Sequence, residues 1–257
     1  MTLKIIRIIA KNTYREIIRD RILYGIMVFA VMLIGLSLAL GQLSFAEQTR
    51  ITIDFGFTAI HLSAVILSIF VGSTLVGREI EKKTILTLLA RPISRTQFIV
   101  GKSFGLMAVI FVASILLSIV LGCILWAMQM TFNESFLVGL YGILLEAGIL
   151  MSFTLFFGCF SSPMLSVSFV IGVFLIGHWQ DSLKFFATKS EAPAFILLSQ
   201  AVKTTLPNFE LFNWRSLFVY NDPVPYHDVM YSTLYGFAWM ALLITLAAII
   251  LRKRDLG

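Results

Sequence analysis

Long apolar runs separated by short polar stretches constrain this sequence more than any other feature. Several of the runs exceed the roughly 18 apolar residues that mark a membrane-spanning helix. Only 13% of the residues are charged, which is far below the roughly 25% of an ordinary soluble domain. A soluble chain would have to bury all of this apolar surface in one core. The sequence therefore predicts an all-α, polytopic membrane protein.

Six runs are long enough to cross a membrane. Their approximate limits are residues 22–41, 57–77, 94–127, 136–160, 164–180 and 229–251. Since no internal repeat or low-complexity linker divides the chain, we expect residues 1–257 to form a single transmembrane domain.

The first 21 residues have the periodicity of a helix. Cations recur every three or four positions, and an apolar face lies beside them, formed by Ile5, Ile6, Ile9, Ala10, Thr13 and Ile17. A helix of this kind lies in the membrane interface, with its cations near anionic lipid headgroups. We therefore expect residues 1–21 to form an interfacial helix that contacts membrane lipids.

The distribution of cations predicts the orientation of the chain. With the N-terminus inside, fifteen Lys and Arg residues fall on the inner side and five on the outer side, namely Arg50, Lys184, Lys189, Lys203 and Arg215. Such a bias follows the positive-inside rule, so the net charge of +6 indicates cytoplasmic loops and no nucleic-acid partner. An even number of spans leaves both termini in the cytoplasm.

A polar segment, residues 78–102, lies tightly between the second and third spans. It contains six cations and, in its middle, an apolar patch formed by Ile85, Leu86, Leu88 and Leu89. Pro92 disfavours the helical conformation at Arg91 and predicts that a short helix ends before it. Ser94 and Gln97 have the spacing of a capping box that starts the third span. We interpret residues 78–95 as a cytoplasmic contact segment.

Residues 181–228, on the outer side before the last span, are too long for a turn. Ser190 and Pro193 predict the start of a helix that ends at Leu206-Pro207. Aromatic and apolar residues follow, and we expect them to rest at the outer membrane interface: Phe209, Leu211, Phe212 and Trp214.

Glu146 lies near the middle of the fourth span, where an ionisable group is costly and faces either a partner or a water-filled cavity. Two interpretations stay open, a translocation or gating contact and a structural carboxyl group packed against a neighbouring helix. His61 and His178 fall near the outer ends of their spans and, with Met128 and Met130, lack the tight spacing of a metal site. We therefore expect no metal ligands and no catalytic residues.

Gly101-Lys102-Ser103 has the ending of a phosphate-binding loop without its beginning. Thr96 stands where the loop requires glycine, and a membrane helix replaces the preceding strand. We expect no cofactor in this chain, so any ATP chemistry belongs to another polypeptide.

The segment that begins Gly77-Arg78-Glu79-Ile80-Glu81-Lys82-Lys83-Thr84 and ends Arg91-Pro92-Ile93-Ser94-Arg95, followed by Gly101-Lys102, resembles the link between spans two and three of type-2 ABC exporter permeases. One departure is Lys83, where that family commonly has glycine. The segment from Leu206 to Trp214, LPNFELFNW, is similar to one in a subgroup associated with maturation of periplasmic copper enzymes such as nitrous oxide reductase.

The resemblance implies a permease subunit in the bacterial inner membrane that is not itself an enzyme. It implies two partners: a separate ABC ATPase subunit, which binds ATP and Mg, and a second permease subunit in a homodimer or a heterodimer. The coupling contacts with the ATPase would then be made by Glu79, Glu81, Thr84, Ile85, Leu88, Leu89, Arg91, Pro92 and Arg95.

Two other functions compete with export of an unidentified substrate. The permease pair could instead pass ATP-driven motion to a periplasmic or envelope partner, which the long outer segment favours. An intramembrane enzyme using Glu146 or the histidines would need paired groups at one depth. The predicted spans place Glu146 centrally and the histidines peripherally, which speaks against an enzyme. The cargo itself is open, since an apolar cavity suits lipids, drugs, hydrophobic peptides, or sulfur or metal species.

Overall fold

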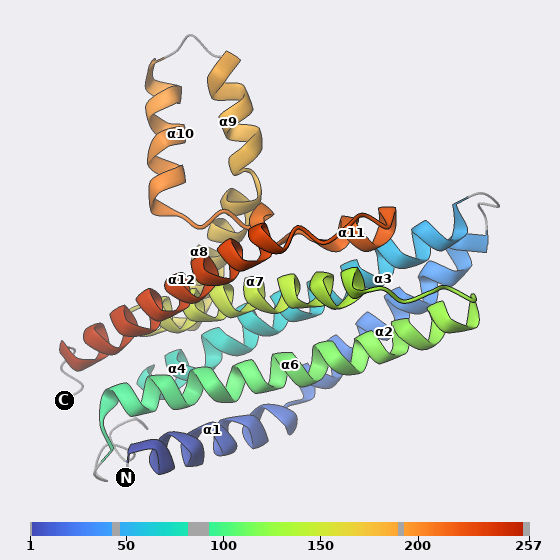
Figure 1. Cartoon of the computed structure of the whole chain (residues 1–257). Helices are drawn as coiled ribbons and strands as arrows, with labels where there is room; N and C mark the ends of the chain where they lie inside the picture. The colour runs from blue at the N-terminus through green and yellow to red at the C-terminus, as the bar shows by residue number, and fades with distance from the viewer. Residues whose placement is uncertain (1, 43–46, 82–92, 190–192, 254–257) are drawn as a thin grey trace.

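The computed structural model describes residues 2–42, 47–81, 93–189 and 193–253. Within these residues all the regular secondary structure is helical, and most of the helices run side by side in one elongated bundle (Figure 1). In chain order the elements are α1 (Thr2–Ile18), α2 (Arg21–Gln42), α3 (Gln48–Ile66), the π-helix η1 (Leu67–Val71), α4 (Gly72–Glu81), α6 (Arg95–Ala127), α7 (Glu134–Gly158), α8 (Pro163–His178), α9 (Gln180–Lys189), α10 (Pro193–Thr205), the 3-10 helix η2 (Glu210–Phe212), α11 (Arg215–Tyr220) and α12 (Tyr226–Lys253).

Five helices in the described part of the chain are long and apolar enough to cross a membrane. Four of them are single helices, and the fifth runs from Gln48 to Gly77 through α3, η1 and α4. A sixth span is reached if α8 and α9, which bend by 55° at their junction, are taken as one broken span. The all-α, polytopic membrane fold predicted from the sequence is thus confirmed, and the fifth predicted span, residues 164–180, corresponds to α8 and ends at the bend.

The second spanning helix begins nine residues earlier than predicted. The sequence suggested a start near Phe57, whereas α3 begins at Gln48. Hydropathy did not predict this start because the first two turns of α3 carry polar residues. These turns are nevertheless helical and pack against α2, with Thr52 and Ile53 buried. As a consequence His61 lies near the middle of a 30-residue helix instead of at its outer end.

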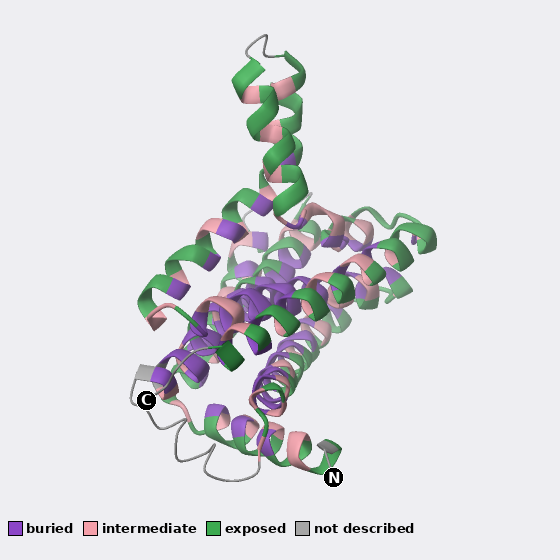
Figure 2. Cartoon of the chain, turned by 90° about the vertical axis from the view of Figure 1, so that its left-hand side faces the viewer, coloured by how far each residue is buried: buried purple, intermediate pink, exposed green. Residues whose placement is uncertain are grey.

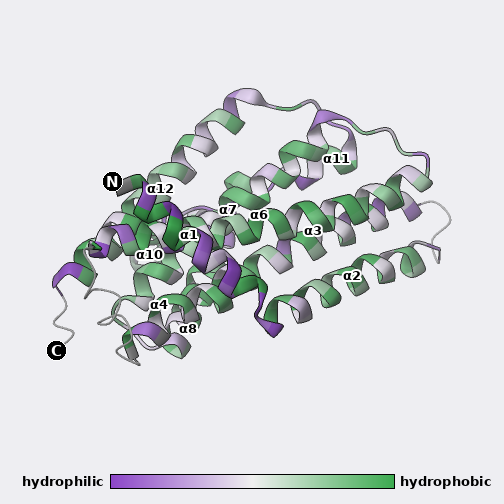
Figure 3. Cartoon of the chain, turned by 90° about the horizontal axis from the view of Figure 1, so that it is seen from below, coloured by the Kyte–Doolittle hydropathy of each residue, from purple (hydrophilic) through white to green (hydrophobic). Residues whose placement is uncertain are grey.

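Burial is concentrated on α3 and α7 at the centre of the bundle (Figure 2). Helices α2, α6 and α12 lie further out and present large apolar side chains on their open faces, among them Phe29, Trp126 and Leu242. The same faces appear as hydrophobic in Figure 3. Lipid-facing helices have this pattern, because the bilayer is as apolar as the core.

Helix α1 packs closely along α6. A Cβ atom at Gly105 would lie 2.6 Å from the Cβ of Thr13, so only glycine permits this approach. Ile9, Thr13 and Ile17 are buried. The predicted helix is confirmed, but part of the face that we expected to lie in lipid packs on α6 instead.

The predicted capping box at the start of α6 is confirmed. Ser94 accepts a hydrogen bond from the backbone N–H of Gln97 at 3.2 Å, and its own N–H donates to Gln97 Oε1 at 3.0 Å. This pairing satisfies two of the backbone N–H groups left open at a helix start and fixes where α6 begins.

The outer segment contains a helical hairpin where the sequence predicted one helix. The predicted helix is α10, and α9 precedes it as an antiparallel neighbour. Figures 1 and 2 show the two helices standing away from the bundle, across its long axis. Most of their residues are exposed.

Candidate functional site

Most of the predicted coupling residues lie outside the described part of the chain. Residues 82–92 include Thr84, Ile85, Leu88, Leu89, Arg91 and Pro92. The backbone of Glu81 ends α4, and Glu79 and Arg95 are described in full. The structure therefore shows how the two ends of the coupling segment are held.

Before the segment, Glu79 is held by a buried cation. Lys102 Nζ lies 2.7 Å from Glu79 Oε1 and 3.4 Å from Glu16 Oε2, and its side chain is only 5% exposed. It also lies 5.7 Å from the centroid of the Phe98 ring. A buried charge is tolerated only with such partners. In the sequence Lys102 belongs to an incomplete phosphate-binding loop and to the Gly101-Lys102 pair of the family resemblance, and neither pattern predicted this pairing. The pairing joins α4, α6 and α1.

After the segment, Arg95 is held by the end of the last helix. Arg95 Nη1 donates to the backbone carbonyl of Leu251 at 2.5 Å and to that of Arg252 at 3.0 Å. Carbonyls in the final turn of a helix have no partner within the helix, and a guanidinium group there also favours the helix dipole. Arg95 thus joins the start of α6 to the end of α12.

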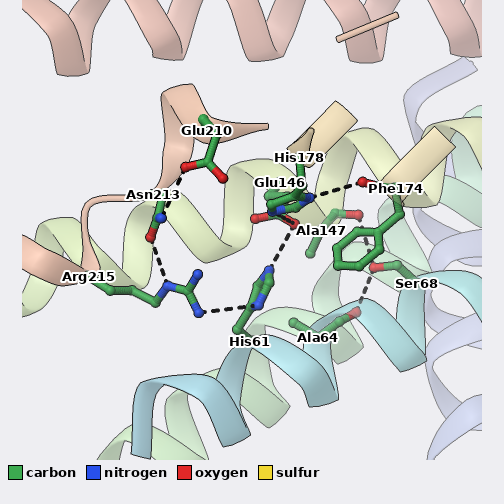
Figure 4. Close-up of polar contacts among 10 residues, drawn as sticks. All are labelled: His61, Ala64, Ser68, Glu146, Ala147, Phe174, His178, Glu210, Asn213 and Arg215. Atoms are coloured by element: carbon green, nitrogen blue, oxygen red, sulfur yellow. Dashed lines mark hydrogen bonds and ion pairs between the residues drawn. The ribbon is translucent and has the colours of Figure 1, made fainter. Parts of the chain in front are cut away.

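A second polar site lies inside the bundle, around Glu146. His61 of α3 and His178 of α8 both turn toward its carboxylate, which α7 supplies (Figure 4). The distance to Glu146 Oε1 is 2.8 Å from His61 Nε2 and 3.5 Å from His178 Nε2. Among the described residues these three offer one ligand atom each, and the three atoms lie within 4.8 Å of one another.

Each histidine of this His61–Glu146–His178 cluster has a partner on its other ring nitrogen. His178 Nδ1 lies 3.1 Å from the carbonyl of Phe174, one helical turn earlier. His61 Nδ1 lies 3.4 Å from Arg215 Nη1, and Arg215 Nε in turn donates to Asn213 Oδ1 at 3.0 Å. The cluster is therefore connected to the segment that precedes α11 (Figure 4).

The aromatic segment at residues 209–214 is buried against the bundle, which corrects the expectation that it rests at the membrane interface. Phe209, Phe212 and Trp214 are between 0% and 7% exposed. Two glycines make room for them, because a Cβ at Gly142 would collide with the Phe212 carbonyl and one at Gly177 with the Phe209 ring. The segment forms a lid over α7 and α8 beside the cluster.

The π-helix η1 follows His61 by two turns. Within it, Ser68 donates to the carbonyl of Ala64 at 2.8 Å and approaches that of Ala147 at 3.0 Å. The second contact fixes α3 against α7 next to Glu146. Single-turn π-bulges occur frequently at functional sites, and this one directly follows α3, the helix that carries His61.

Glu146 was predicted from the sequence as a candidate residue, and His178 does lie at the end of its helix, but the predicted position of His61 was wrong. The contacts of both histidines with Glu146 were not predicted. The argument against an intramembrane enzyme, that Glu146 and the histidines lie at different depths, therefore no longer holds. A usable signal was present, since His61, Glu146 and His178 are isolated polar residues within apolar runs.

The part of the chain that matches a known family includes the residues that flank 82–92 and, of the cluster, His61 and Glu146. The model of the ABC-2 family transporter protein family matches residues 17–177, which is more than half of the chain. Comparison with curated proteins gives no match. Membrane components of transporters make up this family, so its chemistry is movement across a membrane and not catalysis by the chain itself. The chain belongs to the ABC-2 transporter family.

Proposed function

We propose that the chain is the permease subunit of an ATP-driven exporter, paired with a second permease subunit and driven by a separate ATPase. Family membership supports this function. The sequence contains no complete phosphate-binding loop, so ATP and Mg would be bound by the partner.

The observation that carries the proposal is the anchoring of both ends of residues 82–92. Glu79, just before them, is paired with the buried Lys102 of α6. Arg95, just after them, donates to two carbonyls of α12. A partner that pushes on the segment therefore moves α4, α6 and α12 together, as rigid-body switching requires.

The ATPase would bind the apolar patch of the segment. Leu88 and Leu89 lie among charged residues in the sequence, which is the composition of an apolar anchor surrounded by a polar rim. ATP-dependent closure of the ATPase pair would supply the difference in contacts between two states that a conformational change needs.

The arrangement of the ends of the bundle supports cytoplasmic termini in a bacterial inner membrane. Helix α1, the start of α6 and the end of α12 lie at the same end (Figure 1). Fifteen of the twenty Lys and Arg residues fall in segments assigned to that side. The positive-inside rule makes this side cytoplasmic, where an ATPase has access to ATP.

The test is to replace Leu88 and Leu89 together with Asp and to measure co-purification of the ATPase and ATP turnover. The matched control is the same double change at Leu197 and Leu198, which are exposed on α10. We expect loss of the ATPase from the first variant and retention by the control. Normal association and turnover in the Leu88/Leu89 variant would reject the coupling function.

A second candidate function is transmission of motion to a periplasmic partner without transport. The α9–α10 hairpin favours it, because the two helices project from the bundle with exposed apolar residues such as Phe186 and Leu197. Replacing residues 183–203 with a short Gly/Ser linker separates the two functions, and it preserves Gln180, whose side chain donates to the carbonyls of Leu206 and Pro207. A scaffold would lose its partner with ATP turnover intact, whereas an exporter would keep its cargo flux.

A further inference from the structure

The cluster of His61, Glu146 and His178 presents two imidazoles and one carboxylate from three different helices. Their side chains are 11%, 5% and 18% exposed, respectively. Placing ionisable groups inside a membrane span costs free energy. Three such groups that converge on one point therefore need an interaction that offsets this cost.

The protons in this cluster can be assigned from its neighbours. A backbone carbonyl only accepts, so His178 Nδ1 carries the proton that is donated to Phe174. In a neutral ring this leaves the lone pair of His178 Nε2, which faces Glu146 Oε1 at 3.5 Å. Two acceptors that face each other in a buried site repel unless a cation lies between them.

The distance from His178 to Glu146 matches that of a metal site, whereas His61 Nε2 lies at a hydrogen-bonding distance of 2.8 Å from Glu146 Oε1 and would move apart from it on metal binding. Zinc binds histidine nitrogen and carboxylate oxygen at about 2.0–2.2 Å, so two ligand atoms of a tetrahedral site are about 3.3–3.6 Å apart. The separation of His178 Nε2 from Glu146 Oε1 falls in this range, and all three ligand atoms lie within 4.8 Å of one another. The Phe174 carbonyl on His178 Nδ1 is also the kind of outer contact that orients a metal-binding histidine.

We propose that His61, Glu146 and His178 bind one divalent transition-metal ion of the zinc class. Two nitrogens and one oxygen suit this class, whereas Mg²⁺ and Ca²⁺ prefer oxygen ligands throughout. Three protein ligands leave at least one coordination position open. The ion would join the middle of the span Gln48–Gly77 and the middle of α7 to the last residue of α8.

Arg215 competes with this ion. Its Nη1 lies 3.4 Å from His61 Nδ1 and donates to the lone pair there. His61 Nε2 then carries a proton, which is donated to Glu146 at 2.8 Å. Metal binding at Nε2 requires this single proton to move to Nδ1, where it faces an N–H group of Arg215, so the contact with Arg215 breaks. Because Arg215 follows the buried lid at residues 209–214, binding is linked to the position of the lid.

The test is binding of Zn²⁺ to the purified full-length chain in detergent, measured by competition with a chromophoric chelator, with Co²⁺ as a spectroscopic probe. We expect one ion per chain and visible absorption bands typical of Co²⁺ in a low-coordinate site. Glu146→Gln keeps the shape of the side chain and should abolish the bands. His178→Ala, at the last residue of α8, is a second variant with a different effect on packing.

The matched control is His227→Ala. His227 also lies near a carboxylate, 3.6 Å from Asp228, but its side chain is 89% exposed. This variant should bind like the wild type, and Arg215→Gln should bind more tightly. Absence of stoichiometric uptake by the wild type, or equal uptake by Glu146→Gln, would overturn the site and leave a proton as the cation of the cluster. Since ATP is absent from the assay, failure here is distinguishable from failure of the transport proposal.

Discussion

Lys102 Nζ lies 2.7 Å from Glu79 Oε1, and this ion pair joins α6 to the helix that leads into residues 82–92. The lysine side chain is 5% exposed and the glutamate side chain 19% exposed. Most surface ion pairs contribute little to stability, but breaking a buried pair leaves one charge without compensation. The pair is therefore a structural link at the base of the bundle.

Replacing Lys102 with Met should destabilise the protein by about 3–5 kcal/mol, because the partly buried Glu79 keeps its charge and loses the contact with Lys102. The free energy of unfolding can be measured by denaturant titration in detergent. Adding Glu79→Gln should recover part of the loss, since it removes the carboxylate that has lost its contact with the ammonium group. Lys11→Met, on the exposed face of α1, is the control. Equal stability of Lys102→Met and the control would show that the ion pair contributes nothing.

Replacing Arg95 with Gln should uncouple ATP hydrolysis from transport. A neutral amide cannot reproduce the two charge-assisted bonds to the carbonyls of Leu251 and Arg252, so α12 is released from the start of α6. In reconstituted vesicles we expect ATP turnover to persist while cargo flux falls.

The control for Arg95 is Arg252→Ala. This change removes an exposed side chain but keeps the backbone carbonyl that accepts from Arg95. It should leave the ratio of flux to turnover unchanged. Full coupling in the Arg95→Gln variant would mean that α12 follows α6 through packing alone.

Two glycine substitutions should change stability in opposite directions. Gly142→Ala places a methyl group against the backbone carbonyl of Phe212, which cannot rotate away, and overpacking of this kind costs about 1–3 kcal/mol. Gly172→Ala meets nothing within 4 Å and should stabilise helix α8 by about 0.5–1 kcal/mol. Thermal unfolding of both variants measures the difference. Similar unfolding temperatures for the two variants would contradict close packing of residues 209–214 against α7.

Hydropathy predicted the helices that cross the membrane, because contact with lipid selects apolar residues over a whole span. The capping box at Ser94 and Gln97 was also readable, since its partners are three residues apart. The start of α3 could not be predicted from hydropathy, because its first turns pack against α2 and do not need apolar side chains that face lipid. That error displaced His61 and concealed its contact with Glu146.

The lid illustrates a different limit of the sequence. Phe212 and Trp214 are equally suited to a membrane interface and to a protein core, so their identity alone does not choose between the two. The choice depends on Gly142 and Gly177, which lie on other helices and open the space for the lid. Only the folded arrangement brings these residues together.

The orientation of the chain can be tested by labelling single cysteines in intact and permeabilised cells. The sequence contains two cysteines, Cys123 and Cys159, and replacing both with Ser gives a background without thiols. Lys203 on α10 and Lys11 on α1 are both exposed, so a cysteine at either position is accessible from its own side of the membrane. With a membrane-impermeant maleimide we expect the variant at position 203 to react in intact spheroplasts and the one at position 11 only after permeabilisation. The reverse pattern would overturn the cytoplasmic placement of the termini and, with it, access of a cytoplasmic ATPase to residues 82–92.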